Sequence, residues 1–560
     1  MGTTGIPVQT TRSASLHVLL AAAHICSMGS LGSSSSSSSS TAEVVTSVSS
    51  LNVTFHFAQA VHAGVYVSGD PWVVGPAVVT HVEPATELDG DSCRHGWELN
   101  PSSVTQNGLD NRISGYNATL VAALPLSLQP FDSVLKAISI TGSTSHGVAL
   151  RVGVILSVLE HPPSTADSFR PPYFGSPAAR KAMPSWTASQ LKLGLLPNHS
   201  MPTMPNPKDA PPTAAEFAGR FSRPQIDHYC NWIGREMHPT ESMPDYGADL
   251  ARDTGDAAML LITDLTLAAK RSIAIGYVQY GLDLFAMLTQ GGCGWPANGG
   301  HGNGRKLPLV YTALLLGDDA IASMLTSGLG RLPCGIPPGA CFSEDGEVQA
   351  EPAHANVTLF GGNQTSEEAY WKLVMTGDGD RIEADPYGWV DGGFLPGDGY
   401  QFCCTSAMWK GTVLPLLLWP QANSVFNSPS VVAYTQRWVA QGAWAAPDPC
   451  APLTGTCTAG GTPCTGTCLD TAGAAAAASG HPCNTSSCCG TPCGVGGVCN
   501  VSLAEYGSKF GPDGHGGCIK DTDLTDGQGR FPGRHGMAKD GGDYESLFAQ
   551  AMWKTYAPTY

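Results

Sequence analysis

Charged residues are scarce in this chain of 560 residues, at 13% where soluble proteins usually carry about a quarter. Basic residues are the scarcer kind, because 29 Lys and Arg stand against 46 Asp and Glu, which gives a net charge of −17. A negative field of this size repels nucleic-acid phosphates and anionic lipid surfaces. We therefore expect no nucleic-acid partner.

Long apolar runs and internal repeats are also missing. No later stretch approaches the roughly 18 uninterrupted apolar residues of a membrane-spanning helix, so we expect no transmembrane segment in the mature chain. No fixed repeat period is visible, which argues against a regular solenoid. The length nevertheless suits roughly two or three domains, because single cores rarely grow beyond about 300 residues.

The amino terminus has the features of a targeting segment. Arg12 is the only charged residue before a short apolar run from Leu16 to Met28, and small residues follow it. We predict a signal peptide over residues 1–30 and a secreted, extracellular protein. The serine run from Ser33 to Ser40 cannot bury enough surface to fold, so residues 31–43 are expected to be a flexible linker.

Sequons and cysteines favour the same secretory route. Nine of the 18 cysteines lie between Cys450 and Cys499, and such density in a Gly/Thr/Pro background predicts a disulfide-rich insert over residues 450–500. The Asn-x-Ser/Thr sequons begin at Asn52, Asn117, Asn198, Asn356, Asn363, Asn484 and Asn500.

Residues 44–160 favour a β-sandwich domain. Short segments rich in β-branched and aromatic residues alternate with turn residues, which is the pattern of strands in an all-β module. The expected strands are 53–57, 64–68, 72–80, 118–122 and 150–159. The Pro-rich residues 161–224 that follow predict an extended linker or a segment wrapped over another domain.

Helical spacing dominates residues 225–449. Several expected helices are apolar on more than one face and joined by glycine-rich loops, so they should stack in layers. Asp264 is expected to cap the helix that runs to residue 288, and Ser428-Pro429 to start the helix at 431–441. The other expected helices are 246–262, 307–316, 405–419 and one near 544–556, the last in a C-terminal segment, 501–560, that returns to this domain.

The segment from Cys293 to Lys306 is the candidate for a functional site. Its five glycines allow close backbone approach to another molecule, and it also carries Trp295, Asn298 and His301. An ordinary reading remains open, in which the segment is a long turn and His301 only caps a helix. Gly299 and Gly304 have the spacing of a phosphate-binding loop, but the Gly-Lys-Ser/Thr sequence is missing and the segment follows an expected helix rather than a strand.

A β-rich module joined to a domain of glycine-loop-linked helical hairpins resembles the secreted (α/α)-toroid, or six-hairpin, polysaccharide lyases and glycosidases. The resemblance covers roughly residues 223–444, is architectural, and rests on no diagnostic motif. It implies an N-terminal β-sandwich, a toroid-like helical domain and a polysaccharide partner.

The residue types fit a β-elimination of uronic-acid glycans. Such a lyase neutralises the uronate carboxylate, removes the C5 proton with a base, and protonates the leaving oxygen. The proposed catalytic residues are His301, Arg305, Asn298, Tyr246 and Tyr400. The proposed substrate-binding residues are Trp295, Trp389 and Lys306.

Two other functions stay open from the sequence. A glycoside hydrolase would use a pair among Asp245, Asp249, Asp391 and Asp398. A non-catalytic wall or matrix glycoprotein would only bind glycan. No cofactor is predicted. The acidic residues 378–385 are a candidate calcium site. Zinc is not favoured, because Cys464 and Cys468 lack a second pair with matching spacing.

Overall fold

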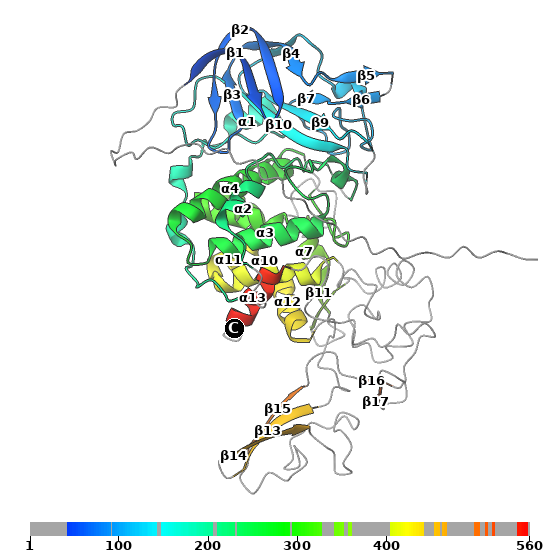
Figure 1. Ribbon diagram of the computed structural model, residues 1–560, viewed down its shortest axis with the longest axis vertical. Coiled ribbons are helices and arrows are strands. Elements are labelled where there is room, and N and C mark those ends of the chain that lie inside the picture. Colours follow the sequence, from blue (N-terminus) through cyan, green and yellow to red (C-terminus); the bar gives the residue numbers. More distant parts are fainter. Residues whose placement is uncertain are drawn as a thin grey trace, which may run out of the picture. The chain divides into compact units, whose positions relative to one another are not determined.

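The computed structural model describes a sheet of residues 43–159, a helical part that follows it, and several short strands (Figure 1). At this level the expectation of a mixed α+β protein is confirmed. The described residues are 42–90, 92–142, 147–204, 210–229, 232–291, 294–326, 341–351, 357–360, 404–441, 453–459, 462–467, 498–503, 510–512, 518–520 and 546–557.

One curled sheet of eight strands forms the N-terminal part. Its order is β7-β9-β10-β3-β2-β4-β8, with β1 paired to β2, and its neighbours are antiparallel except for β3 and β10. The strands are β1 (Glu43–Ser50), β2 (Val53–Val65), β3 (Pro71–Val74), β4 (Ala77–Glu83), β7 (Trp97–Leu99), β8 (Leu126–Leu128), β9 (Ser133–Ser139) and β10 (Leu150–Leu159). A separate hairpin pairs β5 (Glu87–Asp89) with β6 (Ser92–Arg94).

Strand β2 produces much of the curl. Its first half pairs with β4 through Thr54 to Phe57, whereas its last three residues pair with β3. The register shifts between His56 and Phe57, and the facing strand β1 has a shift of its own. Such irregularities bend a strand and increase its twist.

Strand β10 is buried on both faces, which explains its nearly continuous apolar sequence. Val152, Val154 and Leu156 belong to the core inside the curl. Ile155 belongs instead to the core shared with the helices. The predicted strand 150–159 is confirmed with the same bounds.

Three other strand predictions are wrong. Residues 64–68 were expected to be a separate strand, but Gly64 and Val65 end β2, and the next residues form a turn in which the N–H of Gly69 donates to the carbonyl of Tyr66 at 2.9 Å. Residues 118–122 were expected to be a strand, but Ala118–Leu120 is a 3₁₀ helix, because the side chain of Asn117 accepts a hydrogen bond from the backbone N–H of Thr119. Residues 72–80 form two strands, β3 and β4, rather than one, because Gly75-Pro76 interrupts the pairing.

The predicted helices in the described residues are present with small shifts. Asp264 does not cap α4, since the side chain of Thr266 accepts from Ala269 instead. The helices are α1 (Pro177–Ala182), α2 (Ala214–Arg220), α3 (Gly247–Leu261), α4 (Leu267–Thr289), α5 (Lys306–Leu316), α6 (Asp319–Thr326), α7 (Ser343–Gly346), α10 (Ser406–Leu418), α11 (Pro420–Phe426), α12 (Pro429–Gln441) and α13 (Leu547–Tyr556). None of the described helices is both long and apolar enough to cross a bilayer.

Helices α3 and α10 approach each other closely at a pair of glycines. A Cβ atom added to Gly255 would lie 2.8 Å from the carbonyl carbon of Gly411, closer than real contacts allow. Bringing two helix backbones together in this way buries α3 and α10 almost completely. Helix α13 joins the same layer, because Trp553 donates its indole N–H to the carbonyl of Lys410 at 2.8 Å.

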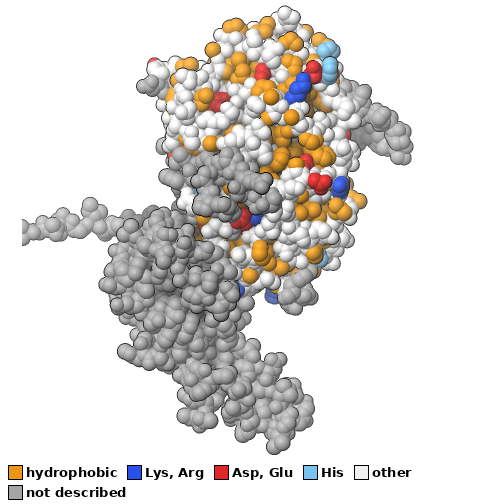
Figure 2. Space-filling view, turned by 180° about the vertical axis from the view of Figure 1, so that it is seen from behind, with side chains coloured by type: hydrophobic (Ala, Val, Ile, Leu, Met, Phe, Trp, Pro, Cys, Tyr) orange, Lys and Arg blue, Asp and Glu red, His pale blue; other side chains and the backbone are white. Residues whose placement is uncertain are grey.

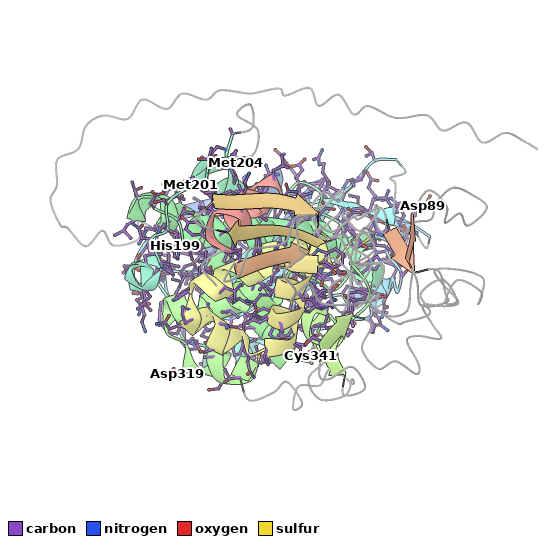
Figure 3. All side chains as sticks on the ribbon, turned by 90° about the horizontal axis from the view of Figure 1, so that it is seen from below. Asp89, His199, Met201, Met204, Asp319 and Cys341 are labelled. Carbon is purple, nitrogen blue, oxygen red and sulfur yellow. The ribbon has the colours of Figure 1, made fainter. Side chains whose placement is uncertain are left out.

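The Pro-rich segment after the sheet holds the sheet and the helices together. Arg170 donates from Nε to Asp70 beside β3 at 2.9 Å, and from both terminal nitrogens to Asp283 of α4 at 3.0 and 2.6 Å. Gln279 of α4 bonds to the backbone N–H and carbonyl of the same arginine. Further along, His199, Met201 and Met204 lie on one side of the molecule (Figure 3), and the ring of His199 packs edge-on to Tyr556 after α13. The Pro-rich segment is therefore packed against the rest of the protein.

The remaining strands form small antiparallel sheets, and the exposed surface carries few charges. On the face seen in Figure 2, acidic and basic side chains are few, and several of them lie next to a side chain of opposite charge. The small sheets pair β11 (Val348–Glu351) with β12 (Val357–Phe360), β13 (Leu453–Ala459) with β14 (Thr462–Thr467) and β15 (Val498–Leu503), and β16 (Phe510–Pro512) with β17 (Cys518–Lys520).

Candidate functional site

The glycine segment between α4 and α5 is packed against the start of α3. A Cβ at Gly300 would collide with the ring of Tyr246, the residue that precedes α3. Gly304 has a φ of 92° and lies against the backbone of Ala251. A carboxylate of α7 also holds the segment, since Glu344 accepts from the N–H of Gly304 at 2.9 Å. The glycine segment is thus packed into the core of the helical part.

Arg305 is occupied by an internal ion pair. It is 2% exposed, and it donates to both carboxylate oxygens of Asp227 at 2.9 and 3.1 Å. Tyr280 and His238 also contact this carboxylate, each at 2.9 Å. Although burial alone would raise it, Arg305 and His238 hold the pKa of Asp227 well below its usual range. The expected role of Arg305 in neutralising a substrate carboxylate does not agree with this placement.

Lys306 and Trp295 are likewise part of the packing. Lys306 is 2% exposed and donates to both oxygens of Asp345 at 2.6 and 2.8 Å. Trp295 is 6% exposed, and its ring is stacked on Phe342 with centroids 6.3 Å apart. Neither side chain presents the open surface that the expected substrate-binding role requires.

His301 and Tyr246 are brought together, as the sequence-based hypothesis required. Their rings meet edge-on, with centroids 4.8 Å apart and an angle of 82°. The guanidinium of Arg235 lies 5.4 Å from the centre of the Tyr246 ring and pairs with Asp245 at 3.0 Å. The Nε atom of Arg235 is buried and has no hydrogen-bond partner among the described residues. We call His301, Tyr246, Arg235 and Asp245 the His301 cluster.

The His301 ring is uncharged near neutral pH. Burial of the half-buried side chain, followed by the nearby positive charges of Arg235 and Arg305, lowers the pKa of His301 to about 4. A neutral imidazole has a lone pair and can therefore accept a proton. The cluster combines a base, a phenol and a cation in one place.

A second carboxylate lies close to the His301 cluster on the first turn of α3. Burial, together with the negative charges of Asp253 and Asp245, raises the pKa of Asp249. Arg252 opposes this shift through an ion pair with Asp249 at 2.9 Å. Two of the four carboxylates named for a hydrolase, Asp245 and Asp249, are therefore near each other.

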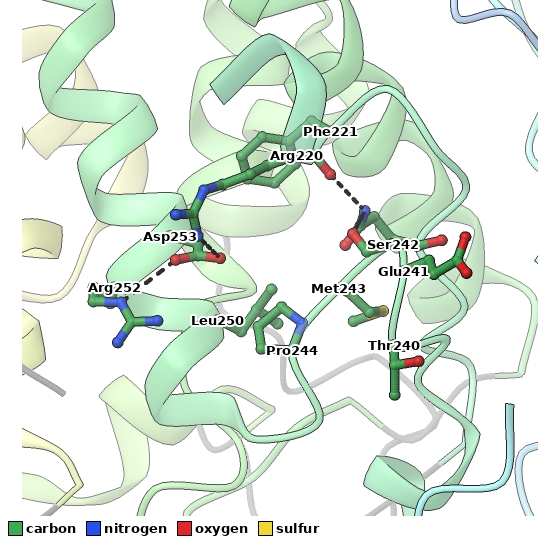
Figure 4. Close-up of a pocket in the computed structure, with 11 residues that line it drawn as sticks. Arg220, Phe221, Thr240, Glu241, Ser242, Met243, Pro244, Leu250, Arg252 and Asp253 are labelled. Carbon is green, nitrogen blue, oxygen red and sulfur yellow. Dashed lines mark hydrogen bonds and ion pairs between the residues drawn. The ribbon is translucent and has the colours of Figure 1, made fainter. Parts of the chain in front are cut away.

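A cavity of about 270 Å³ opens beside α3 (Figure 4). Its wall includes Pro244, which directly precedes Asp245 of the His301 cluster. We call it the α3 cavity, and its lining residues are Arg220, Phe221, Gln225, Thr240, Glu241, Ser242, Met243, Pro244, Leu250, Arg252 and Asp253.

Several predicted site residues lie outside the described residues. They are Tyr400, Trp389, Asp391, Asp398 and the acidic segment 378–385. Asn298 is described and exposed, with its backbone N–H donated to Glu347 at 3.1 Å. Among the residues with described side chains, no group of three or more His, Cys, Asp or Glu is placed to hold a metal ion.

Arg235 is the site residue that sequence reasoning missed. It lies in the 3₁₀ helix Trp232–Met237, a segment too short to show helical periodicity. Its contacts with Tyr246 and Asp245 join residues about ten positions apart through a loop. The sequence signal that could have identified Arg235 is its position about ten residues before Asp245 and Tyr246.

Comparison with known proteins identifies no relative of this chain. No protein-family model, curated protein or solved structure matches the chain.

Proposed function

We propose that this protein is a secreted carbohydrate-active enzyme, a polysaccharide lyase that cleaves uronic-acid glycans by β-elimination. The observation that carries the proposal is the His301 cluster, in which a neutral imidazole, a phenol and an arginine lie together. Those are the three kinds of group that a β-elimination needs.

Each group has a defined part in the proposed reaction. His301 takes the C5 proton, the electrons of the C5–H bond form a double bond to C4, and the C4–O bond breaks. The leaving oxygen takes a proton from Tyr246, which recovers one from the His301 imidazolium. Arg235 neutralises the substrate carboxylate and so makes the C5 proton more acidic. It takes the place of Arg305, because the pair of Arg305 with Asp227 is almost fully buried, whereas the pair of Arg235 with Asp245 is partly exposed.

The proposal also includes the architecture of the two parts. Helices joined in pairs through short loops, with α3 and α10 at their centre, support an (α/α)-toroid-like domain. The curled sheet supports an accessory β-sandwich. The disulfide-rich insert at 450–500 is also part of the proposal.

Secretion is supported by where the sequons lie. Asn52 and Asn198 are both exposed, so a glycan attached to either would extend into solvent. The signal peptide at 1–30 remains part of the proposal.

The direct test is to incubate the purified secreted protein with a panel of uronate-rich polysaccharides and follow the ultraviolet absorbance of unsaturated products. His301→Ala should lower the rate by about 100-fold or more, because it removes the base. His62→Ala, an exposed histidine on β2, is the matched control and should leave the rate unchanged. Thermal melts of both variants establish that they fold. A flat trace on every polymer would remove the lyase assignment.

A glycoside hydrolase is the second candidate, and the raised pKa of Asp249 beside Asp245 favours it. A carboxyl group with a raised pKa can act as the general acid while its neighbour stays ionised. This function predicts new reducing ends without ultraviolet absorbance, and loss of that activity in Asp249→Asn. Glycan binding with neither product would instead indicate a non-catalytic wall or matrix glycoprotein.

A further inference from the structure

The α3 cavity adjoins the His301 cluster along the chain. Pro244 lines the cavity, and Asp245 and Tyr246 are the next two residues. Neighbouring Cα atoms are about 3.8 Å apart, so the Cα atoms of Pro244 and Tyr246 are separated by about 8 Å at most. Arg252, which also lines the cavity, pairs with Asp249 of the first turn of α3 at 2.9 Å.

Two arginines share one carboxylate on the rim of the cavity. Arg220 donates to Asp253 at 2.8 Å, and Arg252 contacts the other oxygen of Asp253 at 3.5 Å (Figure 4). The second partner of Arg220 is Glu216, one helical turn away, in a pair whose side chains are 40% and 45% exposed. Exposed pairs of this kind are weak. A ligand carboxylate can therefore replace Glu216 at Arg220 at small cost and form a charge-assisted pair.

The other walls suit the ring of a sugar. Ser242 is 6% exposed, lines the cavity, and has a hydroxyl with no hydrogen-bond partner among the described residues. Buried hydroxyls nearly always have a partner, so one left without it inside a cavity indicates a place for a ligand hydroxyl or water. Met243 and Leu250 provide apolar surface for the C–H face of the ring.

We propose that the α3 cavity is a subsite for one uronic-acid residue of the polysaccharide, with its carboxylate at Arg220 and its hydroxyls at Asp253 and Ser242. This inference rests on the proposed function for its polymer, but the binding itself does not need the chemistry of His301. A volume of about 270 Å³ restricts the cavity to a single sugar unit.

The test is calorimetric titration of the full chain with galacturonate, glucuronate and the neutral sugars galactose and glucose. Either uronate should bind about tenfold more tightly than its neutral counterpart, because only the uronate gains the ionic contact. Arg220→Met should remove that tenfold preference and leave neutral-sugar binding unchanged. Arg271→Met is the matched control, since Arg271 pairs with Asp167 at 3.5 Å and neither residue lines the cavity. Ser242→Ala, which removes only the unpartnered hydroxyl, should weaken all four sugars together.

The outcomes separate the two proposals. Uronate preference that depends on Arg220 and persists in His301→Ala supports the subsite, even if no polymer yields unsaturated product. Unsaturated product together with equal binding of uronates and neutral sugars would overturn the subsite and leave the lyase in place. Uronate preference that survives Arg220→Met in a folded variant would also overturn the subsite.

Discussion

Two buried ion pairs lie in the helical part, one between Arg170 and Asp283 and the other between Arg305 and Asp227. All four residues are at most 2% exposed, and the paired atoms are 3.1 Å or less apart. The curled sheet contains ionisable groups that are buried as deeply. Lys136 is 0% and Glu98 3% exposed, and neither takes part in a salt bridge among the described residues. Lys136 donates to the backbone carbonyl of His95, and Glu98 accepts from the backbone N–H of Gly108 at 2.5 Å.

The difference appears in the pKa values. Burial lowers the pKa of Lys136 to about 7 and raises the pKa of Glu98 to about 7. In the helical part, ion pairs hold the pKa of Asp227 low and that of Arg305 high, against the effect of burial. The Arg305–Asp227 pair thus stays charged across the ordinary pH range, whereas Lys136 and Glu98 make the stability of the sheet depend on pH.

The largest expected effect comes from breaking a pair in the helical part. Arg305→Met leaves the carboxylate of Asp227 buried with only His238 and Tyr280, and should lower the free energy of unfolding by about 3–5 kcal/mol. Denaturant titration measures this change. Arg223→Met, at an exposed pair, is the control and should change stability by less than about 1 kcal/mol. Equal losses in the two variants would refute the contrast between buried and exposed pairs.

A smaller effect is expected from Lys136 in the sheet. The folded-state pKa of about 7 lies below the unfolded value, so the unfolded chain binds more protons between about pH 7 and 10.5, and stability rises with pH there. The slope contributed by this group is about 1 kcal/mol per pH unit. Lys136→Met should remove it between pH 7.5 and 9.5, as measured by denaturant titrations at several pH values. An unchanged slope, or the same change in the exposed control Lys192→Met, would contradict the account.

The smallest effect is expected at the weak pair beside the α3 cavity. Glu216→Ala removes the i,i+4 partner of Arg220 and should change the free energy of unfolding by about 0.5 kcal/mol or less. The melting temperature provides the measurement. A loss comparable to that of Arg305→Met would mean that exposure does not decide the strength of these pairs.

Elements with strong periodicity or continuous apolar sequence were predictable. Strand β10 and helix α5 are buried on most sides, and their composition alone marks them. The strand prediction for residues 118–122 was wrong although the run is β-branched and apolar. Next to a capping asparagine, such a run can form a 3₁₀ turn when no strand pairs with it.

The site was predictable only in part, because pairing partners are set by tertiary structure. His301 and Tyr246 meet as expected. Arg305 and Lys306 were assigned to substrate because nothing in the sequence shows that their partners, Asp227 and Asp345, lie 78 and 39 residues away. Arg235 was missed for the same reason, since only the folded chain places it over Tyr246.

The most direct test of the His301 cluster is the pH dependence of kcat/KM for the elimination reaction in the wild type and in Arg235→Gln. In the wild type, the rate should fall on the acid side with an apparent pKa of about 4, where His301 becomes protonated. Arg235 is the charge that lowers this pKa most, after burial, so Arg235→Gln should move the acid side of the profile toward the ordinary histidine value of about 6.5 and reduce the maximal rate. An acid side that stays in place in the variant, or a wild-type profile with no transition that depends on His301, would contradict the assignment of His301 as the base.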